Sequence, residues 1–239
     1  MYKVDILAIA AHPDDLELSC SGTLIKHIKS GSKVAILDLT QGELGTRGNA
    51  KIRLDESDHA KKIMGVHFRE NLGLADGFFE GNKEDILKLI SIIRKYQPEI
   101  VLANSLEDRH PDHGRAGKFI QDSCFYSGLR KIETIINNES QVAWRPKQVY
   151  HYIQDYYLKP DIIVDISDHF DQKMEAIKAF KSQFYDPNSN EPVSPISGED
   201  FFDFIKGRSA QLGRLINTKF GEGFIASRPI GIDNLHSLK

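Results

Sequence analysis

The chain has 239 residues, of which 40% are hydrophobic, 27% charged and 9% aromatic, as in an ordinary globular protein of one or two domains. Its 31 Lys and Arg against 34 Asp and Glu give a net charge of −3, which argues against the broad basic field that nucleic-acid and acidic-membrane binding use. No apolar run approaches the roughly 18 residues of a membrane span, so neither a nucleic acid nor a membrane is expected as a partner. Cys20 and Cys124 form no disulfide framework, which makes a reducing, cytoplasmic compartment the default expectation.

The N-terminal half alternates apolar runs with helical patterns. Strands are predicted at residues 6–10, 33–39, 66–72 and 100–103. Four helices are predicted between and after these strands. The first ends at Gly31, the second runs from an Asn49 N-cap to Gly65, the third starts at Asn82, and the fourth follows the fourth strand to about Ser127. This alternation predicts an α/β protein with a doubly wound parallel sheet in which the strand order is 3-2-1-4.

Beyond residue 130 the pattern is less regular. Strands are predicted at 149–154, 162–166 and 220–226, and helices at 168–181 and within 199–217. Residues 186–198 contain three prolines and are interpreted as a long, mobile loop that covers the mouth of a site. No linker divides the chain, so one domain is expected over 1–239, with a core at 1–130 and a C-terminal part at 131–239 that completes the site.

Two similar motifs follow predicted strands. The sequence HPDD at residues 12–15 follows the first strand, and HPDH at residues 110–113 follows the fourth. In a 3-2-1-4 sheet these strands are neighbours about 4.8 Å apart, and the strand order reverses between them, which is where ligands bind in such folds. The two motifs are therefore expected to meet in one crevice.

The residue types in these motifs suit a metal. Two histidines and one carboxylate with an open fourth position make up a catalytic zinc site. Because the adjacent Asp14 and Asp15 cannot easily aim at one ion, one should ligate it and the other stay free as a base, and spacing does not decide between them. The competing interpretation, in which the aspartates cap a helix and the histidines are ordinary polar groups, explains two related motifs poorly. No GxGxxG, GxxxxGK[ST] or GxSxG sequence supports a nucleotide site or a serine nucleophile.

These motifs, with Glu17, the Gly-rich loop 42–48, Arg53 and Gly-Glu-Gly-Phe at 221–224, resemble the LmbE/PIG-L family of zinc-dependent N-acetylglucosaminyl deacetylases over nearly the whole chain. Within that family the sequence is most similar to members that act on N-acetylglucosaminyl-malate in bacillithiol biosynthesis. The resemblance implies a Rossmann-like, mostly parallel sheet flanked by helices. It also implies a homo-oligomer, with a hexamer as one form.

The resemblance further implies how the residues of both motifs divide the chemistry. The implied ligands of one Zn²⁺ per chain, with other divalent metals as alternatives, are His12, Asp15 and His113. The implied catalytic residues are Asp14 as general base, a protonated His110 that stabilises the oxyanion, and Asp112 as the partner that orients His110. Zinc lowers the pKa of its water towards about 7. Asp14 would accept the proton and pass it to the departing amine, which is a poor leaving group.

Basic residues near the carboxyl edge of the sheet indicate an acidic substrate. Arg47, Arg53 and Arg109 present guanidinium forks that suit carboxylates, and they are predicted to bind substrate. The alternative is that Arg53 is a solvated helix residue and that Arg109 pairs with a neighbouring carboxylate. Tyr185 is a candidate for the mobile tyrosine that some relatives place at the mouth of the site.

The expected function is hydrolysis of the N-acetyl group of a small-molecule N-acetylglucosamine conjugate, with the malate conjugate favoured. One alternative is the same reaction on another conjugate, such as an N-acetylglucosaminyl lipid or a thiol conjugate. A second alternative is a non-catalytic module that binds metal or sugar. An unliganded Asp14 beside the metal would favour the enzyme, because a binding module does not need it.

Overall fold

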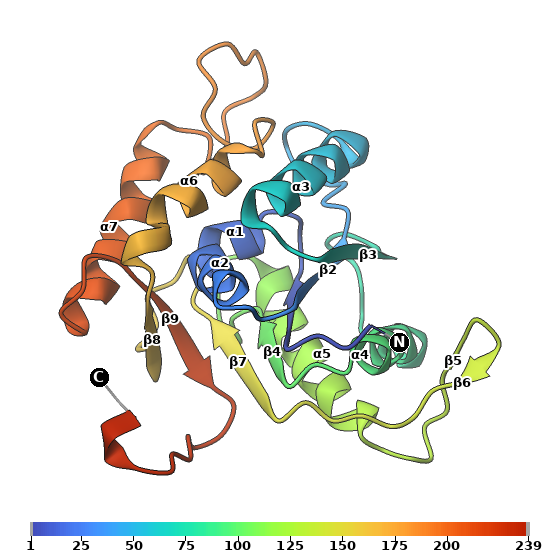
Figure 1. The fold of residues 1–239 in the computed structure, drawn as a ribbon. Coiled ribbons are helices and arrows are strands. Elements are labelled where there is room, and N and C mark those ends of the chain that lie inside the picture. Colours follow the sequence, from blue (N-terminus) through green and yellow to red (C-terminus); the bar gives the residue numbers. More distant parts are fainter. Residues whose placement is uncertain (1, 238–239) are drawn as a thin grey trace.

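A seven-stranded sheet organises the chain in the computed structural model, which describes residues 2–237 (Figure 1). The order of its strands is β3-β2-β1-β4-β7-β9-β8. The strands are β1 (Ile6–Ala10), β2 (Val34–Thr40), β3 (Phe68–Leu74), β4 (Ile100–Ala103), β7 (Gln148–Tyr152), β8 (Ile162–Asp165) and β9 (Gly221–Ala226). The helices are α1 (Asp15–Ser19), α2 (Ser21–Lys29), α3 (Ala50–Met64), α4 (Lys83–Tyr96), α5 (Pro111–Ser127), α6 (Phe170–Lys178) and α7 (Asp200–Leu215).

The first four strands confirm the predicted order. β1 pairs in parallel with β2 on one side and with β4 on the other, and β2 pairs in parallel with β3. Every residue of β1 and β2 is buried, as expected for strands covered on both faces. The order of the strands reverses between β1 and β4, so the ends of these two strands form the expected crevice.

Alternate residues of β1 point to opposite faces of the sheet, and each face has its own core. Leu7 and Ile9 pack in a cluster with side chains of α4 and α5. Ile6 and Ala8 pack in another cluster with side chains of α2 and α6. Helices therefore cover both faces, in agreement with the α/β architecture expected from the sequence.

The second half of the chain extends the same sheet. β7 continues the parallel part beside β4, but β9 runs antiparallel to both of its neighbours, β7 and β8. The sequence predicted these strands without their directions. It did not predict the short hairpin of β5 (Ile135–Ile136) and β6 (Glu139–Ser140), and the helix predicted at 168–181 is a 3₁₀ turn (Ser167–His169) followed by α6. None of the helices within residues 2–237 is long and apolar enough to cross a membrane.

The stretch after the first motif forms two helices where one was predicted. α1 ends at Ser19, and α2 begins at Ser21. Cys20 between them has a φ of −142°, which departs from helical geometry. The Glu222 carboxylate of β9 accepts hydrogen bonds from the backbone N–H groups of Gly22 and Thr23 at 3.0 and 2.6 Å. A carboxylate at this position satisfies free N–H groups of a new helix start and favours a break. The predicted N-caps Asn49 and Asn82 are confirmed.

Candidate active site

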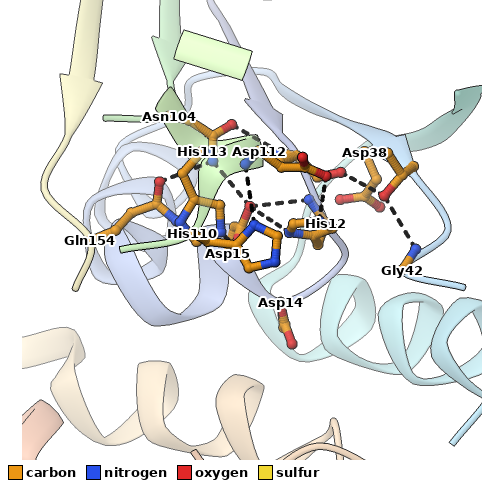
Figure 2. Close-up of polar contacts among 12 residues, drawn as sticks. His12, Asp14, Asp15, Asp38, Gly42, Asn104, His110, Asp112, His113 and Gln154 are labelled. Atoms are coloured by element: carbon orange, nitrogen blue, oxygen red, sulfur yellow. Dashed lines mark hydrogen bonds and ion pairs between the residues drawn. The ribbon is translucent and has the colours of Figure 1, made fainter. Parts of the chain in front are cut away.

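The two motifs meet at the carboxyl ends of β1 and β4, in a cavity of about 360 Å³. Figure 2 shows their side chains gathered there, with His12 and Asp15 facing the residues that follow β4. The ring centroid of His12 lies 4.8 Å from that of His110 and 5.5 Å from that of His113. Residues about 100 positions apart in sequence therefore share one site, as the strand order predicts.

Asp15 lies between His12 and His113. Its Oδ1 is 3.1 Å from His113 Nε2, and its Oδ2 is 3.8 Å from His12 Nδ1. Asp15 Oδ2 also accepts hydrogen bonds from the backbone N–H of His12 at 3.1 Å and from Asn104 Nδ2 at 3.0 Å. The three residues that the family resemblance implies as ligands thus converge on one another, with the carboxylate fixed in the middle.

In both His12 and His113, the ring nitrogen that points away from Asp15 contacts another carboxylate. His12 Nε2 lies 2.9 Å from Asp76 Oδ1 and 3.3 Å from Asp112 Oδ2, and His113 Nδ1 is hydrogen-bonded to Asp108. Metal-binding histidines are commonly oriented in this way, by a carboxylate on the ring nitrogen that does not bind the ion. The arrangement leaves His12 Nδ1 and His113 Nε2 directed toward Asp15.

The charges of the site fit a divalent cation. Four aspartates contact the two imidazoles. Burial alone would lower the pKa of each imidazole, but the carboxylates raise it, to about 9 for His113 and well above the ordinary value for His12. Burial would raise the pKa of Asp15, but the two histidines hold it well below its usual range. A cation would neutralise this excess of negative charge, and nitrogen with carboxylate donors is the donor set of catalytic zinc.

Two groups of side chains lie close enough together to hold an ion within the described part of the chain, and neither includes Asp15. One consists of His12, His110 and His113, and the other of His12, Asp76 and Asp112. Both share His12 with the implied ligand set. The cavity therefore concentrates metal donors around His12.

Asp14 differs from its neighbour in both backbone and partner. Its φ of 115° lies in the left-handed region that non-glycine residues rarely adopt, and such strain concentrates at functional sites. Its Oδ2 accepts a hydrogen bond from Arg53 Nη2 at 3.0 Å. Burial raises the pKa of Asp14 to about 7 against the opposing effect of Arg53. Asp14 is therefore a carboxylate on the cavity wall whose bonding partner is Arg53, and Asp15 is the aspartate that contacts the histidines.

The Asp112 side chain was expected to orient His110, but its carboxylate is bonded to other groups. The carboxylate of Asp112 contacts His12 and accepts hydrogen bonds from Arg115 Nη1 at 2.7 Å and the Gly77 N–H at 2.8 Å. His110 is the N-cap of α5, and its Nδ1 accepts the backbone N–H of Asp112 at 3.2 Å. The polypeptide turns into α5 between the two residues, which directs their side chains to different partners.

The surroundings of His110 do not favour the protonated form expected from the family resemblance. Burial, together with the nearby His12 and His113, lowers the pKa of His110 below its ordinary value. A neutral imidazole whose Nδ1 accepts a hydrogen bond carries its proton on Nε2. His110 can therefore still donate one hydrogen bond, from Nε2, without a positive charge.

The three arginines predicted to bind substrate all line the cavity, but each already donates hydrogen bonds to protein acceptors. Arg53 Nη2 donates to Asp14 and, at 2.5 Å, to Gln183 Oε1. Arg47 donates to the carbonyls of residues 183 and 184 at 3.4 and 3.1 Å and to the hydroxyl of residue 189 at 2.6 Å. Arg109 Nε donates to Asp155 Oδ2 at 2.9 Å, so it pairs with a carboxylate from another loop. The interpretation of Arg53 as a solvated helix residue is also wrong, because Arg53 is buried.

Tyr185 and the loop at 186–198 have different places. Tyr185 is 39% exposed and is not among the residues that line the cavity, so the structure does not place it at the mouth. The loop lies between α6 and α7, in orange at the top of Figure 1, and its Ser194, Pro195 and Ile196 line the cavity. The loop therefore borders the site, as expected from the sequence.

Sequence reasoning missed several residues that shape the site. Asp76 follows β3, Asn104 directly follows β4, and Asp108 precedes the second motif by two residues. Asn104 Nδ2 joins Asp15 to Gln154 Oε1, which lies just after β7, at 3.0 Å from each. The available signal was position, because each of these residues follows the carboxyl end of a parallel strand.

Comparison with known proteins finds a family model, curated relatives and solved structures that match this chain. The family model "PIG-L: GlcNAc-PI de-N-acetylase" matches residues 7–124, which include both motifs. The diacetylchitobiose deacetylase of Thermococcus kodakarensis is 31% identical over 190 residues, 75% of this chain and 70% of the relative. A conserved protein of Thermus thermophilus has a structure with a TM-score of 0.85 and 32% identity, over 97% of this chain and 98% of that one.

One relative whose name includes malate is less similar. The "Probable N-acetyl-alpha-D-glucosaminyl L-malate deacetylase 2" of Bacillus cereus is 25% identical over 191 residues, 74% of this chain and 83% of the relative. The chitobiose deacetylase is thus the more similar of the two. Both of these relatives are named as deacetylases, and they differ in the compound that their names give. Another match, the 4-oxalmesaconate hydratase of Pseudomonas putida, is 26% identical over 193 residues, 74% of this chain and 73% of the relative.

Proposed function

We propose that this chain, which belongs to the GlcNAc-PI de-N-acetylase (PIG-L) family, uses one zinc ion and acts on N-acetylglucosaminyl-malate. The chain is an amidohydrolase that deacetylates N-acetylglucosamine conjugates. The observation that carries this proposal is the division of labour between adjacent aspartates. Asp15 contacts two histidines, whereas Asp14 is bonded to Arg53 on the wall of the same cavity. A site that only bound metal would not need the second carboxylate.

The residues proposed to hold the ion are His12 through Nδ1, Asp15, and His113 through Nε2. This set is preferred to one that includes Asp76 or Asp112, because those carboxylates contact the opposite nitrogen of His12 and so orient its ring. When bound, zinc would supply a Lewis acid that polarises the acetamide carbonyl and acidifies a water molecule.

The chain's own groups complete the proposed reaction. Asp14 accepts the proton of the attacking water, and a pKa of about 7 suits a base at neutral pH. The water oxygen bonds to the acetyl carbon, and the electrons of the C=O π bond move to the carbonyl oxygen. As the C=O bond re-forms, the C–N bond breaks and Asp14 returns the proton to the departing nitrogen. His110 donates its Nε2–H to the oxygen that gains negative charge. The products are acetate and the free amine of the glucosamine conjugate.

Arg53 is proposed to support the base rather than to bind substrate. Its bond to Asp14 orients the carboxylate and opposes the effect of burial on its pKa. The roles predicted for Arg47, Arg109 and Tyr185 in binding substrate have less support, because Arg47 and Arg109 are already bonded and Tyr185 lies off the cavity.

The organisation of the chain is also a proposal. Because β7, β9 and β8 continue the sheet that carries the motifs, we propose that residues 1–239 act as one deacetylase domain. A cytoplasmic location and a homo-oligomer, with a hexamer as one form, rest on cysteine usage and family resemblance. Light scattering of the purified protein would test the assembly.

The proposed function is tested by acetate release. Zinc-loaded protein would be incubated with N-acetylglucosaminyl-malate, diacetylchitobiose and free N-acetylglucosamine, and both acetate and the new amine would be quantified. We expect equal amounts of both products, with the highest kcat/KM for the malate conjugate. A higher kcat/KM for diacetylchitobiose would overturn the malate assignment, and no acetate from any of the three would overturn the reaction.

A further inference from the structure

Arg47 and Arg208 are the cavity arginines without a carboxylate partner among the described residues, and of the two only Arg208 lacks a hydrogen bond shorter than 3.5 Å. Arg208 lies on α7 and lines the same cavity as both motifs. Arg47, Arg53 and Arg109 are each held by protein contacts, and Arg53 and Arg109 are paired with aspartates. Within residues 2–237, no ion pair includes Arg208.

The contacts that Arg208 does make are weak. Its Nη2 lies 3.5 Å from the carbonyl oxygen of Leu18, at the limit of a hydrogen bond. That oxygen already accepts a bond from Lys173 Nζ at 2.9 Å. The guanidinium carbon lies 5.3 Å from the ring centroid of Phe204, which holds the charge above an aromatic face. Most donors of the guanidinium fork therefore remain available to a ligand, as far as the described part of the chain is concerned.

The surroundings of Arg208 make an anionic ligand favourable. Phe201, Phe204 and Ile205 of α7 and Pro195 of the preceding loop line the same cavity. Apolar walls exclude water and strengthen the attraction between a fixed cation and an anion. Burial lowers the pKa of Arg208, against the opposing effect of the carboxylates of Asp155, Asp108 and Glu222. Each of these three carboxylates is paired with another side chain, and none forms an ion pair with Arg208 in the described chain.

The position of Arg208 also matches the reach of a sugar conjugate. Leu18 lies three residues after Asp15 on the same short helix, about 4.5 Å along the helix axis at 1.5 Å per residue. An anion on Arg208 would therefore lie close to the metal-binding residues but not among them. The acetamide and the anion can then belong to one small molecule.

We propose that Arg208 binds an anionic group, a carboxylate or a phosphate, on the part of the substrate attached to the glucosamine, and so determines substrate specificity. This inference rests on the proposed function. It assigns the preference for an acidic conjugate to a residue of α7, instead of the three arginines that the sequence suggested.

Three substrates that share one sugar distinguish the possible ligands. They are N-acetylglucosaminyl-malate, which carries carboxylates, N-acetylglucosamine 1-phosphate, and the neutral methyl N-acetylglucosaminide. kcat/KM would be measured for wild type, Arg208→Met and Arg208→Lys. Arg214→Met is the matched control, because Arg214 is an exposed arginine of the same helix. A bonded charged contact corresponds to about ten- to hundredfold in affinity.

We expect Arg208→Met to lower the ratio of kcat/KM for an anionic substrate over the neutral one by at least about tenfold. Arg208→Lys should retain part of the ratio, and Arg214→Met should leave it unchanged. The larger loss, for the malate conjugate or the phosphate, identifies the anion. Equal losses for all three substrates would mean that Arg208 only supports α1, and this would overturn the inference.

A binding measurement separates this inference from the proposed function. Calorimetry would compare glucosaminyl-malate and methyl glucosaminide, the deacetylated compounds, on wild type and Arg208→Met. If wild type releases no acetate from any substrate, the proposed function fails. Arg208 is still supported if Arg208→Met alone weakens binding of glucosaminyl-malate, and it is rejected if the two proteins bind that compound equally.

Discussion

Asp108 is expected to control how tightly the site binds zinc, although it is not a proposed ligand. Its Oδ1 accepts the backbone N–H groups of Asp155 and Tyr156 at 3.0 and 2.9 Å, and its Oδ2 is hydrogen-bonded to His113 Nδ1. Asp108→Asn can keep the two backbone bonds through its amide oxygen. It then presents an N–H group to the Nδ1–H of His113, so a charge-assisted hydrogen bond is replaced by two opposed donors.

The size of this effect follows from the lost bond. A hydrogen bond to a charged group contributes about 1.5–3 kcal/mol, and about 1.4 kcal/mol is tenfold in a dissociation constant. We therefore expect Asp108→Asn to weaken zinc binding by about 10- to 100-fold, the range typical of residues that orient a metal-binding histidine.

Competition with a chromophoric chelator measures this dissociation constant directly. Asp122→Asn is the matched control, because Asp122 is an aspartate of α5 that pairs with Lys118 on the surface. The control should bind zinc as wild type does, and circular dichroism should show that both variants are folded. A zinc affinity of folded Asp108→Asn within twofold of wild type would refute the proposed placement of His113 in the metal site.

Three further predictions concern catalysis, stability and the loop. Asp14→Asn should retain zinc and lower kcat/KM by about 10²–10⁴-fold, because an amide cannot accept the proton; full activity, or loss of zinc, would remove Asp14 from the role of base. Lys173→Met leaves the buried Glu222 carboxylate without the cation that lies 2.6 Å away, and should lower the free energy of unfolding by about 3–5 kcal/mol in urea titrations. A loss below about 1 kcal/mol would show that the backbone N–H groups suffice for Glu222. Product should protect residues 186–198 from limited proteolysis if the loop orders over the cavity, and equal cleavage with and without product would contradict that function.

The part of the site that depends on strand order could be predicted from the sequence. The apolar runs of β1 and β4 and the reversal between them place residues 12–15 beside residues 110–113, without knowledge of any loop. Local signals also sufficed for the caps at Asn49 and Asn82, because their side chains bond N–H groups two or three residues away.

Contacts between distant loops could not be predicted in the same way. Arg53 and Asp14 are 39 positions apart, and Arg109 and Asp155 are 46 apart, so only the folded chain brings each pair together. The sequence shows which side chains are charged but not which charges neutralise one another. For that reason it overestimated the number of free arginines, and it overlooked Arg208 on a helix whose packing position is set by the tertiary fold.

The direction of β9 was equally beyond local pattern. The sequence of a strand does not show in which direction it runs, and the pairing with β7 and β8 decides that β9 runs antiparallel. That pairing brings Glu222 to the start of α2, where it breaks the helix that periodicity alone would continue.

His12, Asp15 and His113 are proposed to hold the zinc ion with which this chain releases acetate. The most direct measurement determines zinc content and acetate release from N-acetylglucosaminyl-malate on the same samples of wild type and His113→Ala. We expect one zinc per chain and equal yields of acetate and amine for wild type, and loss of both zinc and acetate release for His113→Ala. Zinc and turnover retained by His113→Ala, or zinc-loaded wild type that releases no acetate, would contradict this proposal.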